Sequence, residues 1–363
     1  MTFSSKVVIA LLPALVVTGC STAPTVSASP TPATVTACLI VDSLGLVDGG
    51  VNESAYSALK EAVVSLGIGK KQTVLRSAQT GSAIYSEVNA LIRGGCNVVI
   101  GTGPKLRPAI IRAADANPDI AFVLVDDEVP PVEAQPLADN LKHLTFEASQ
   151  SAILAGYLAA ANSKTGLVAT FGSFNNAAVR SVMQGFVQGV QLFNDDEDAD
   201  VVVLGAGGDG SKWSFLNSAI NQKGARELTN RFFEIGADVV YPVAGLAGIG
   251  AALAAVEKTD KFVIGSDRDW FMDADNLAWR SQVLASTVKQ VSRPVLEVIK
   301  RYVSTGEVGN PLTNAFVGTL ANGGVSLTAE RDVSFAPQFI SARSRITASI
   351  NSGETPTPKG TTE

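Results

Sequence analysis

The sequence predicts an α/β protein made of two lobes, each built around a parallel β-sheet. Short apolar strands alternate with helical segments through almost the whole chain. The strands show almost no polar alternation, which is typical of parallel strands that are buried on both faces. The strand–helix pattern begins again at about Thr145, and two βαβ series in tandem indicate two lobes.

The first series starts with the apolar run TACLIVD and continues as strands and helices in strict alternation. The expected elements are a strand at 36–42, a helix at about 52–66, a strand at 72–77, a helix at 82–95, a strand at 97–101, a helix at 107–118 and a strand at 121–127.

The second series follows the same plan. Gly-Ala-Asp-Val-Val at 236–240 echoes Gly-Cys-Asn-Val-Val at 95–99, and each follows a helix, which suggests that the lobes repeat one design. The expected elements are helices at 147–163, 179–194, 225–236 and 248–258, and strands at 166–172, 201–205, 238–243 and 262–267.

A long, acidic, glycine-rich loop joins the first strand to the first helix. The strand ends on Asp42, and VDSLGLVDGGVNES carries the chain to Asn52, which opens the helix. The last strand of the second series likewise ends on Asp267. Because ligands of open parallel sheets lie beyond the carboxyl ends of the strands, we expect a cleft between the lobes lined by aspartates and glycines.

Both ends of the chain differ in composition from the centre. One lysine precedes the run VVIALLPALVV, so residues 1–19 are expected to be a signal peptide. Val-Thr-Gly-Cys resembles a lipobox in which Cys20 is acylated, the alternative being an ordinary signal peptide with a chance cysteine. Residues 20–35 are a Ser/Thr/Pro tether, and 349–363 a disordered tail.

The composition of the chain limits the kinds of partner that it can bind. The net charge is −6 and no basic stripe is present, which argues against nucleic acid. Cys38 and Cys96 remain once Cys20 is assigned to lipid. Both flank predicted strands that are neighbours in a doubly wound sheet. The sequence is therefore compatible with a disulfide between them and also with two buried free thiols.

The sequence offers little for catalysis. The one histidine, His143, is interpreted as structural, because no Ser/His/Asp or metal-binding set can be assembled around it. No phosphate-binding loop, cofactor motif or metal motif is complete, so neither a cofactor nor a metal is expected. Two ionised carboxylates, Asp42 and Asp267, are well suited to accept paired hydroxyls of a sugar, and Lys289 would keep them ionised.

Several segments together resemble the basic membrane protein (BMP) family. The segments are the opening Asp42 to Ser54, NPDIAFVLVD, TFEASQSAILAGYLAA, MQGFVQGV, GADVVYPVAGLAGIGAA, IGSDRDW and LASTVKQV, in the order of the family. The resemblance covers about residues 38–345. It implies lipoprotein substrate-binding components of ABC importers, several of them purine-nucleoside receptors. It also implies a type I periplasmic-binding-protein fold, with two Rossmann-like lobes joined by a hinge of three crossovers.

The resemblance implies a set of ligand-binding residues. Asp42 and Asn52 match first-lobe contacts, and Gly245, Asp267 and Lys289 match the ribose-binding side. Phe215 aligns with an aromatic residue that stacks on a purine, the alternative being core packing. The sequence departs from the family pattern at two places: Val51 replaces the first-lobe stacking aromatic, and Pro108 stands where an acidic residue is expected. Tyr56, one turn beyond Asn52, is a candidate substitute for that aromatic.

We therefore expect a lipid-anchored receptor on the extracytoplasmic face of the cell membrane. It would bind a nucleoside or related riboside between the lobes and pass it to separate permease and ATPase subunits, acting as a monomer. Lobe 1 would comprise 36–145 plus about 289–315, and lobe 2 146–288 plus about 316–348. The alternatives are a family member that binds another ligand or acts as a sensor, and a nucleoside-acting enzyme.

Overall fold

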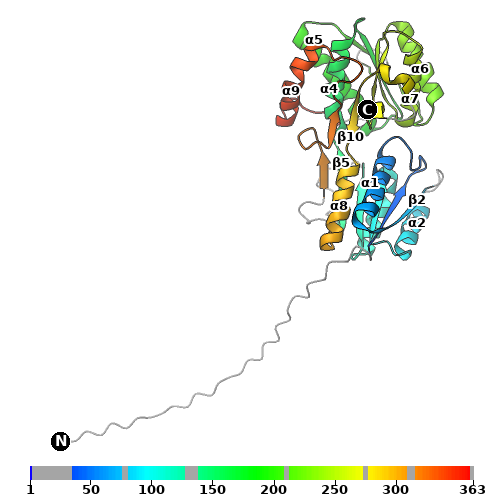
Figure 1. The fold of residues 1–363 in the computed structure, drawn as a ribbon, viewed down its shortest axis with the longest axis vertical. Helices are drawn as coiled ribbons and strands as arrows, with labels where there is room; N and C mark the ends of the chain where they lie inside the picture. Colours follow the sequence, from blue (N-terminus) through cyan, green and yellow to red (C-terminus); the bar gives the residue numbers. More distant parts are fainter. Residues whose placement is uncertain are drawn as a thin grey trace.

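The computed structural model describes residue 1 and residues 35–75, 81–126, 138–207, 212–272, 277–308 and 315–359. Apart from residue 1, the expected signal peptide, Cys20 and the expected tether up to residue 34 lie outside these residues. Two six-stranded sheets form two lobes, placed one above the other in Figure 1. This confirms the α/β class and the two-lobe architecture. In the described part of the chain, no helix combines the length and apolarity needed to cross a bilayer.

Lobe 1 contains a parallel sheet with the strand order β11-β5-β4-β3-β1-β2. Its strands are β1 (Thr36–Val41), β2 (Gly69–Val74), β3 (Val98–Thr102), β4 (Ala121–Val125), β5 (Leu141–Phe146) and β11 (Ala315–Gly318). Its helices are α1 (Val51–Leu66), α2 (Gly81–Arg93), α3 (Arg107–Ala116) and α8 (Ser292–Thr305), with the short 3-10 helix η2 (Pro104–Leu106).

Lobe 2 repeats this plan with the order β12-β10-β9-β8-β6-β7, in which β12 alone pairs antiparallel. Its strands are β6 (Leu167–Gly172), β7 (Val202–Leu204), β8 (Val239–Val243), β9 (Phe262–Gly265), β10 (Val283–Lys289) and β12 (Val325–Leu327). Its helices are α4 (Ala148–Asn162), α5 (Ala177–Glu197), α6 (Gln222–Ile235), α7 (Ile249–Val256) and α9 (Pro337–Ser352), with 3-10 helices η3 (Gly245–Gly248), η4 (Trp270–Met272) and η5 (Leu277–Gln282).

Alternate residues of the central strands serve two separate cores, as the period of a strand requires. In β1, Leu39 packs with α1 and α8 on one face of the sheet, whereas Ile40 packs with α2 and α3 on the other. In lobe 2, α4, α5 and α9 cover one face, and α6 and α7 cover the other. Because both faces are covered, central strands such as β4 and β9 are apolar throughout, which explains their unbroken apolar runs in the sequence.

The edge strand β2 departs from this pattern. It begins at Gly69, three residues before the expected start, and nearly all of its residues are exposed. Lys70 and Lys71 lie in it, and charged side chains on an edge strand discourage pairing with another chain. Its register is parallel to β1, with Thr36 opposite Gly69.

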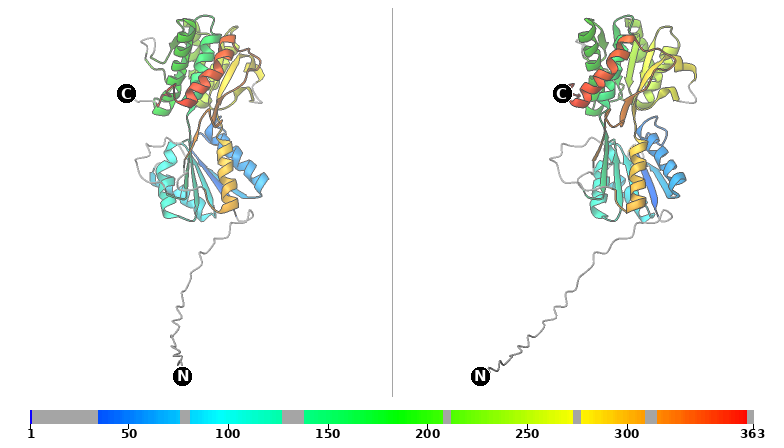
Figure 2. Two further views of the ribbon diagram at one scale, coloured as in Figure 1. Left: turned by 90° about the vertical axis from the view of Figure 1, so that its left-hand side faces the viewer. Right: turned by 60° about the vertical axis from the view of Figure 1, so that its left-hand side comes forward.

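The chain crosses between the lobes after β5, after β10 and between β11 and β12 (Figure 2). The third crossing lies a few residues later than expected, because β11 belongs to lobe 1 up to Gly318. At the C-terminus, α9 extends past the expected boundary at 348. Lys359 then pairs with Glu147 at 2.9 Å, so the end of the described chain contacts the start of α4.

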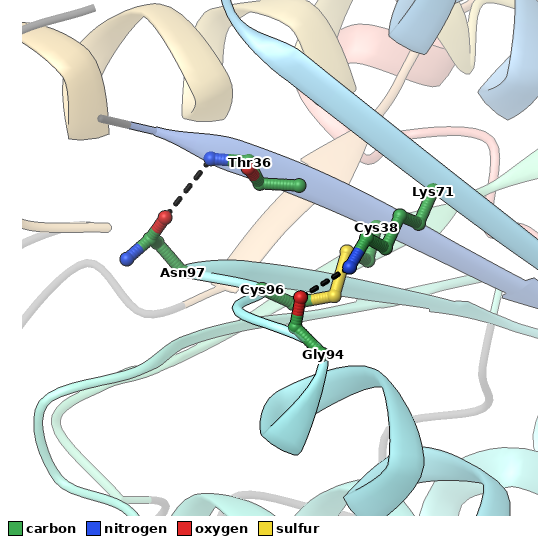
Figure 3. The surroundings of a disulfide bond; sticks show 6 residues. All are labelled: Thr36, Cys38, Lys71, Gly94, Cys96 and Asn97. Carbon is green, nitrogen blue, oxygen red and sulfur yellow. Dashed lines mark hydrogen bonds between the residues drawn. A yellow bond between two sulfur atoms is a disulfide. The ribbon is translucent and has the colours of Figure 1, made fainter. Parts of the chain in front are cut away.

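Cys38 and Cys96 form a disulfide, with their Cα atoms 5.9 Å apart (Figure 3). Cys38 lies in β1, and Cys96 lies just before β3, the strand beside it. Thr36 donates its backbone N–H to Asn97 Oδ1 at 2.9 Å, which reinforces the same junction. Of the two alternatives that the sequence left open, the structure has the bridge.

Candidate functional site

A cavity of about 680 Å³ lies between the lobes, at the carboxyl ends of strands from both sheets. Its volume is within the range of small-molecule binding sites. Six of the seven residues expected to bind ligand line it: Asp42, Val51, Asn52, Gly245, Asp267 and Lys289.

On the lobe 1 side, a chain of hydrogen bonds links three polar residues. Asn52 donates from Nδ2 to Asp42 Oδ1 at 2.9 Å, and Thr102 donates its hydroxyl to Asn52 Oδ1 at 2.5 Å. The backbone N–H of Leu44 also donates to Asp42 Oδ1, at 3.0 Å. Both donors are on Oδ1, so, as far as the described segments go, Oδ2 of Asp42 can accept from a ligand.

Asp48 shapes the loop that precedes α1. Its carboxylate accepts the backbone N–H groups of Gly50 at 2.9 Å, Asn52 at 3.2 Å and Glu53 at 2.9 Å. Burial raises the pKa of the Asp48 carboxyl, although these three donors act to lower it. Asp48 thus caps α1 and places Asn52 at the edge of the cavity.

Asp267 and Lys289 lie together on the lobe 2 side. Asp267 follows β9 with φ +69°, a left-handed conformation, and Lys289 ends β10. The ammonium is 3.5 Å from Asp267 Oδ1 and 2.9 Å from Asp126 Oδ2. Burial by itself would lower the pKa of Lys289, but the two carboxylates outweigh it and raise the pKa. The ammonium therefore remains charged beside both carboxylates.

The lining is acidic and aliphatic. Asp42, Asp48, Asp126 and Asp267 face a single cation, Lys289, among the described residues of the lining. The remaining wall is made largely of small apolar side chains from both lobes, such as Val51, Pro104, Ala148, Ala177, Ala178, Val179, Val182 and Val243. Tyr241 is the one aromatic among the described lining residues, and its hydroxyl lies 2.8 Å from Thr287 Oγ1.

Phe215 does not line the cavity. It is half-buried, packs against the core under α4 and α5, and its ring lies 5.7 Å from the guanidinium of Arg180. Pro108 and Tyr56 are also outside the lining. The ammonium groups of Lys60 and Lys70 lie 4.9 Å and 5.0 Å from the centre of the Tyr56 ring. A stacking role for Phe215 stays a prediction.

Several polar residues of the cavity were absent from the expected ligand-binding set, among them Thr102 and Asp126. Thr102 ends β3 and Asp126 follows β4, each at the carboxyl end of a central strand. Both residues could have been found from the sequence, because they stand at the carboxyl ends of predicted strands, where ligands of parallel sheets bind. The ion pair of Asp126 with Lys289 joins the two lobes, and no local sequence pattern predicts it.

Comparison of the sequence with known proteins identifies a family to which it is similar. The model of the Bmp family, described as ABC transporter substrate-binding protein PnrA-like, matches residues 34–357. Basic membrane protein D of Borreliella burgdorferi is 27% identical over 289 residues, covering 79% of this chain and 77% of that protein. The ABC transporter nucleoside-binding protein BmpA of Lactococcus lactis is 27% identical over 307 residues, covering 80% of each.

Solved structures show the same fold at low sequence identity. A solute-binding protein of an ABC transporter system from Conexibacter woesei has a TM-score of 0.68 at 18% identity, covering 90% of this chain and 99% of that one. A solute-binding protein from Aeropyrum pernix has a TM-score of 0.68 at 19% identity, covering 88% and 92%. The match of the family model over nearly the whole folded part, with this fold, shows that the chain belongs to the Bmp family of PnrA-like ABC transporter substrate-binding proteins.

Proposed function

We propose that the protein is a receptor that binds a nucleoside or related riboside between its lobes and delivers it to an ABC importer. The observation that carries this proposal is the placement of one strand-end carboxylate from each lobe, Asp42 and Asp267, on a single cavity. Ionised carboxylates accept hydrogen bonds from hydroxyl groups, and each such charge-assisted bond contributes about 1.5–3 kcal/mol. The name of the Lactococcus lactis relative supports a nucleoside.

In this proposal the residues divide by lobe. Asp42 and Asn52 hold the ligand from lobe 1, while Gly245 and Asp267 hold the ribose from lobe 2, with Lys289 beside them. Gly245 has φ +54°, which glycine adopts without strain, and this backbone turn brings peptide groups to the cavity. Phe215 would stack on the base only after a rearrangement that brings its ring to the cavity.

The remaining parts of the proposal concern location and partners. Acylation of Cys20 would anchor the chain to the extracytoplasmic face of the membrane, with residues 20–35 as the tether. The chain would work as a monomer with separate permease and ATPase subunits. Ligand would shift a hinge equilibrium toward the closed form by its higher affinity for that form.

The aliphatic lining favours one alternative, a ligand without a purine. Base–aromatic stacking contributes about 1–3 kcal/mol per base, and Tyr241 is the single aromatic side chain of the described lining. A family member with this wall could bind a different polar solute, or sense it, through the same carboxylates.

A thermal-shift panel tests the proposal. Guanosine, inosine, adenosine and cytidine are compared with free bases and with ribose, and a ligand at a hundred times its Kd stabilises by about 2.7 kcal/mol. We expect at least one nucleoside to raise the melting temperature, and Asp267→Asn, which tolerates the left-handed backbone of this residue, to abolish this rise while the unliganded protein still unfolds cooperatively. Stabilisation by ribose alone, or by nothing, would refute the nucleoside. Release of free base would instead indicate an enzyme.

A further inference from the structure

We propose that Asp126 is a positioning residue of the cleft, which fixes the ammonium of Lys289 and thereby keeps Asp267 available to ligand hydroxyls. This inference rests on the proposed function, since it names a further residue of the same site. Asp126 belongs to lobe 1, whereas Lys289 and Asp267 belong to lobe 2.

The contact distances place Lys289 closer to Asp126 than to Asp267. Its Nζ atom is 3.1 Å from Asp126 Oδ1 and 2.9 Å from Asp126 Oδ2, so both oxygens accept from the ammonium. The distance to Asp267 Oδ1 is 3.5 Å. The side chain of Lys289 is 16% exposed, and those of both aspartates are 27% exposed. The ammonium is therefore held chiefly from the opposite lobe, in a partly desolvated place.

Both aspartates leave their strands in the same unusual backbone conformation. Asp126 has φ +53° and Asp267 has φ +69°, which non-glycine residues seldom adopt and which persists where the surroundings fix it. The N–H of Asp126 donates to the carbonyl of Leu144 at 2.8 Å, and the N–H of Lys289 donates to the carbonyl of Asp267 at 3.1 Å. The three charged groups are thus mounted on backbone that is tied to the two sheets.

This arrangement determines whether the carboxylate of Asp267 is available to accept a hydrogen bond from a ligand. With Asp126 present, the ammonium is shared and lies 3.5 Å from the carboxylate of Asp267, beyond its 2.9 Å distance to Asp126, so Asp267 keeps the capacity to accept a ligand hydroxyl. Without Asp126, the ammonium would have Asp267 as its one close carboxylate and would pair with it directly. A ligand hydroxyl would then have to displace the ammonium before it could bind.

Asparagine is the informative substitution at 126. It tolerates a left-handed backbone, so the turn is preserved, but it removes the charge that holds Lys289. We expect Asp126→Asn to weaken inosine binding about tenfold, as loss of one charge-assisted hydrogen bond would. Asp126→Gly, which also accepts this backbone conformation, is the second variant should the first not fold.

The double variant Asp126→Asn/Lys289→Met distinguishes positioning from a general structural effect. If Asp126 acts through Lys289, the Kd of the double variant for inosine, measured by calorimetry, equals that of Lys289→Met alone. If the two losses multiply, Asp126 does not act through Lys289 and the inference is wrong. Asp269→Asn is the control, because it removes an ion pair of similar exposure, 2.7 Å from Arg331, and should leave inosine binding unchanged.

A second measurement requires no ligand. Because the two carboxylates raise the pKa of Lys289, its amine should be acetylated slowly in the intact protein. Mass spectrometry should show that Lys289 is acetylated several-fold faster in Asp126→Asn, with other lysines unchanged. Equal rates would overturn the inference. Faster acetylation in a protein that no nucleoside stabilises would support the positioning role and refute the nucleoside alone.

Discussion

Thr102 donates its hydroxyl to Asn52 Oδ1 at 2.5 Å and thereby orients the Asn52 amide. With its oxygen engaged, the amide has only its NH₂ group to offer Asp42, to which it donates at 2.9 Å. Thr102 and Asn52 are both almost fully buried. The lobe 1 side of the cavity is thus preorganised before any ligand arrives, which reduces the cost of ordering on binding.

Removal of the Thr102 hydroxyl should weaken ligand binding. Thr102→Val leaves Asn52 Oδ1 without its buried donor, so the amide can rotate and Asp42 loses a fixed partner. We expect about a tenfold rise in the Kd for the stabilising nucleoside, together with a loss of about 1 kcal/mol in unfolding free energy. Thr170→Val is the matched control, because it deletes a buried hydroxyl bonded to the carbonyl of Tyr241 at 2.7 Å. Equal Kd changes in the two variants would contradict the orienting role.

Asp48→Ala should destabilise the start of α1. The substitution removes the acceptor for three backbone N–H groups, and loss of a helix cap costs about 1–2 kcal/mol. Urea unfolding measures the loss. Asp48→Asn keeps one acceptor oxygen and should lose less; an alanine variant as stable as the asparagine variant would show that the cap contributes little.

Reduction of the disulfide should lower stability. Cys38 and Cys96 are 58 residues apart in sequence, and the chain-entropy treatment of a loop of that length gives about 4 kcal/mol. We expect Cys38→Ala/Cys96→Ala to unfold at lower denaturant than the parent protein. The reductant dithiothreitol should shift the parent protein toward the variant and leave the variant itself unaffected. If reductant leaves the denaturation midpoint of the parent protein unchanged, the disulfide does not contribute to stability in this way.

Stability should fall as the pH drops through the range set by His143. Burial lowers the pKa of this imidazole from 6.5 to about 4. Between these two values the unfolded chain binds a proton that the folded chain does not. The stabilisation is therefore complete above pH 6.5 and is lost as the pH falls toward 4, by about 3 kcal/mol.

Chemical denaturation at pH 7.5 and at pH 4.5 measures the contribution of His143 to the free energy of unfolding, with His143→Leu as the comparison. The variant has no imidazole, so its stability should depend less on pH over this interval, whatever its absolute stability at pH 7.5. Parallel pH profiles for the parent protein and the variant would assign the acid sensitivity to other groups.

The parallel sheets, the strand ends and the cleft could be predicted from the sequence because they depend on local apolar pattern. Asp42 and Asp267 are found by that reasoning alone: Asp42 directly follows β1, Asp267 lies two residues after β9, and parallel strands collect their carboxyl ends on one side of a sheet. The disulfide was left open since sequence fixes neither the distance nor the direction of two cysteines.

Contacts between distant segments could not be predicted in the same way. The Asp126–Lys289 pair joins residues 163 positions apart in different lobes, and its formation depends on how the lobes are set against each other. Phe215 shows the opposite case: its alignment suggested a stacking role, which stays a prediction, whereas its ring lies outside the cavity lining, beside Arg180. An aromatic residue at a familiar sequence position carries no information about the direction of its ring.

The late position of β11 has a consequence for biosynthesis. This strand completes the lobe 1 sheet, yet it follows β10 of lobe 2 in the chain, and α8 of lobe 1 also follows β10. A polypeptide that emerges from the ribosome N-terminus first can assemble most of the second sheet before the first is finished. Neither lobe can reach its native state until most of the chain has been made, because lobe 1 requires α8 and β11 and lobe 2 requires β12 and α9. A chain truncated after β10 would lack a helix and an edge strand in both lobes.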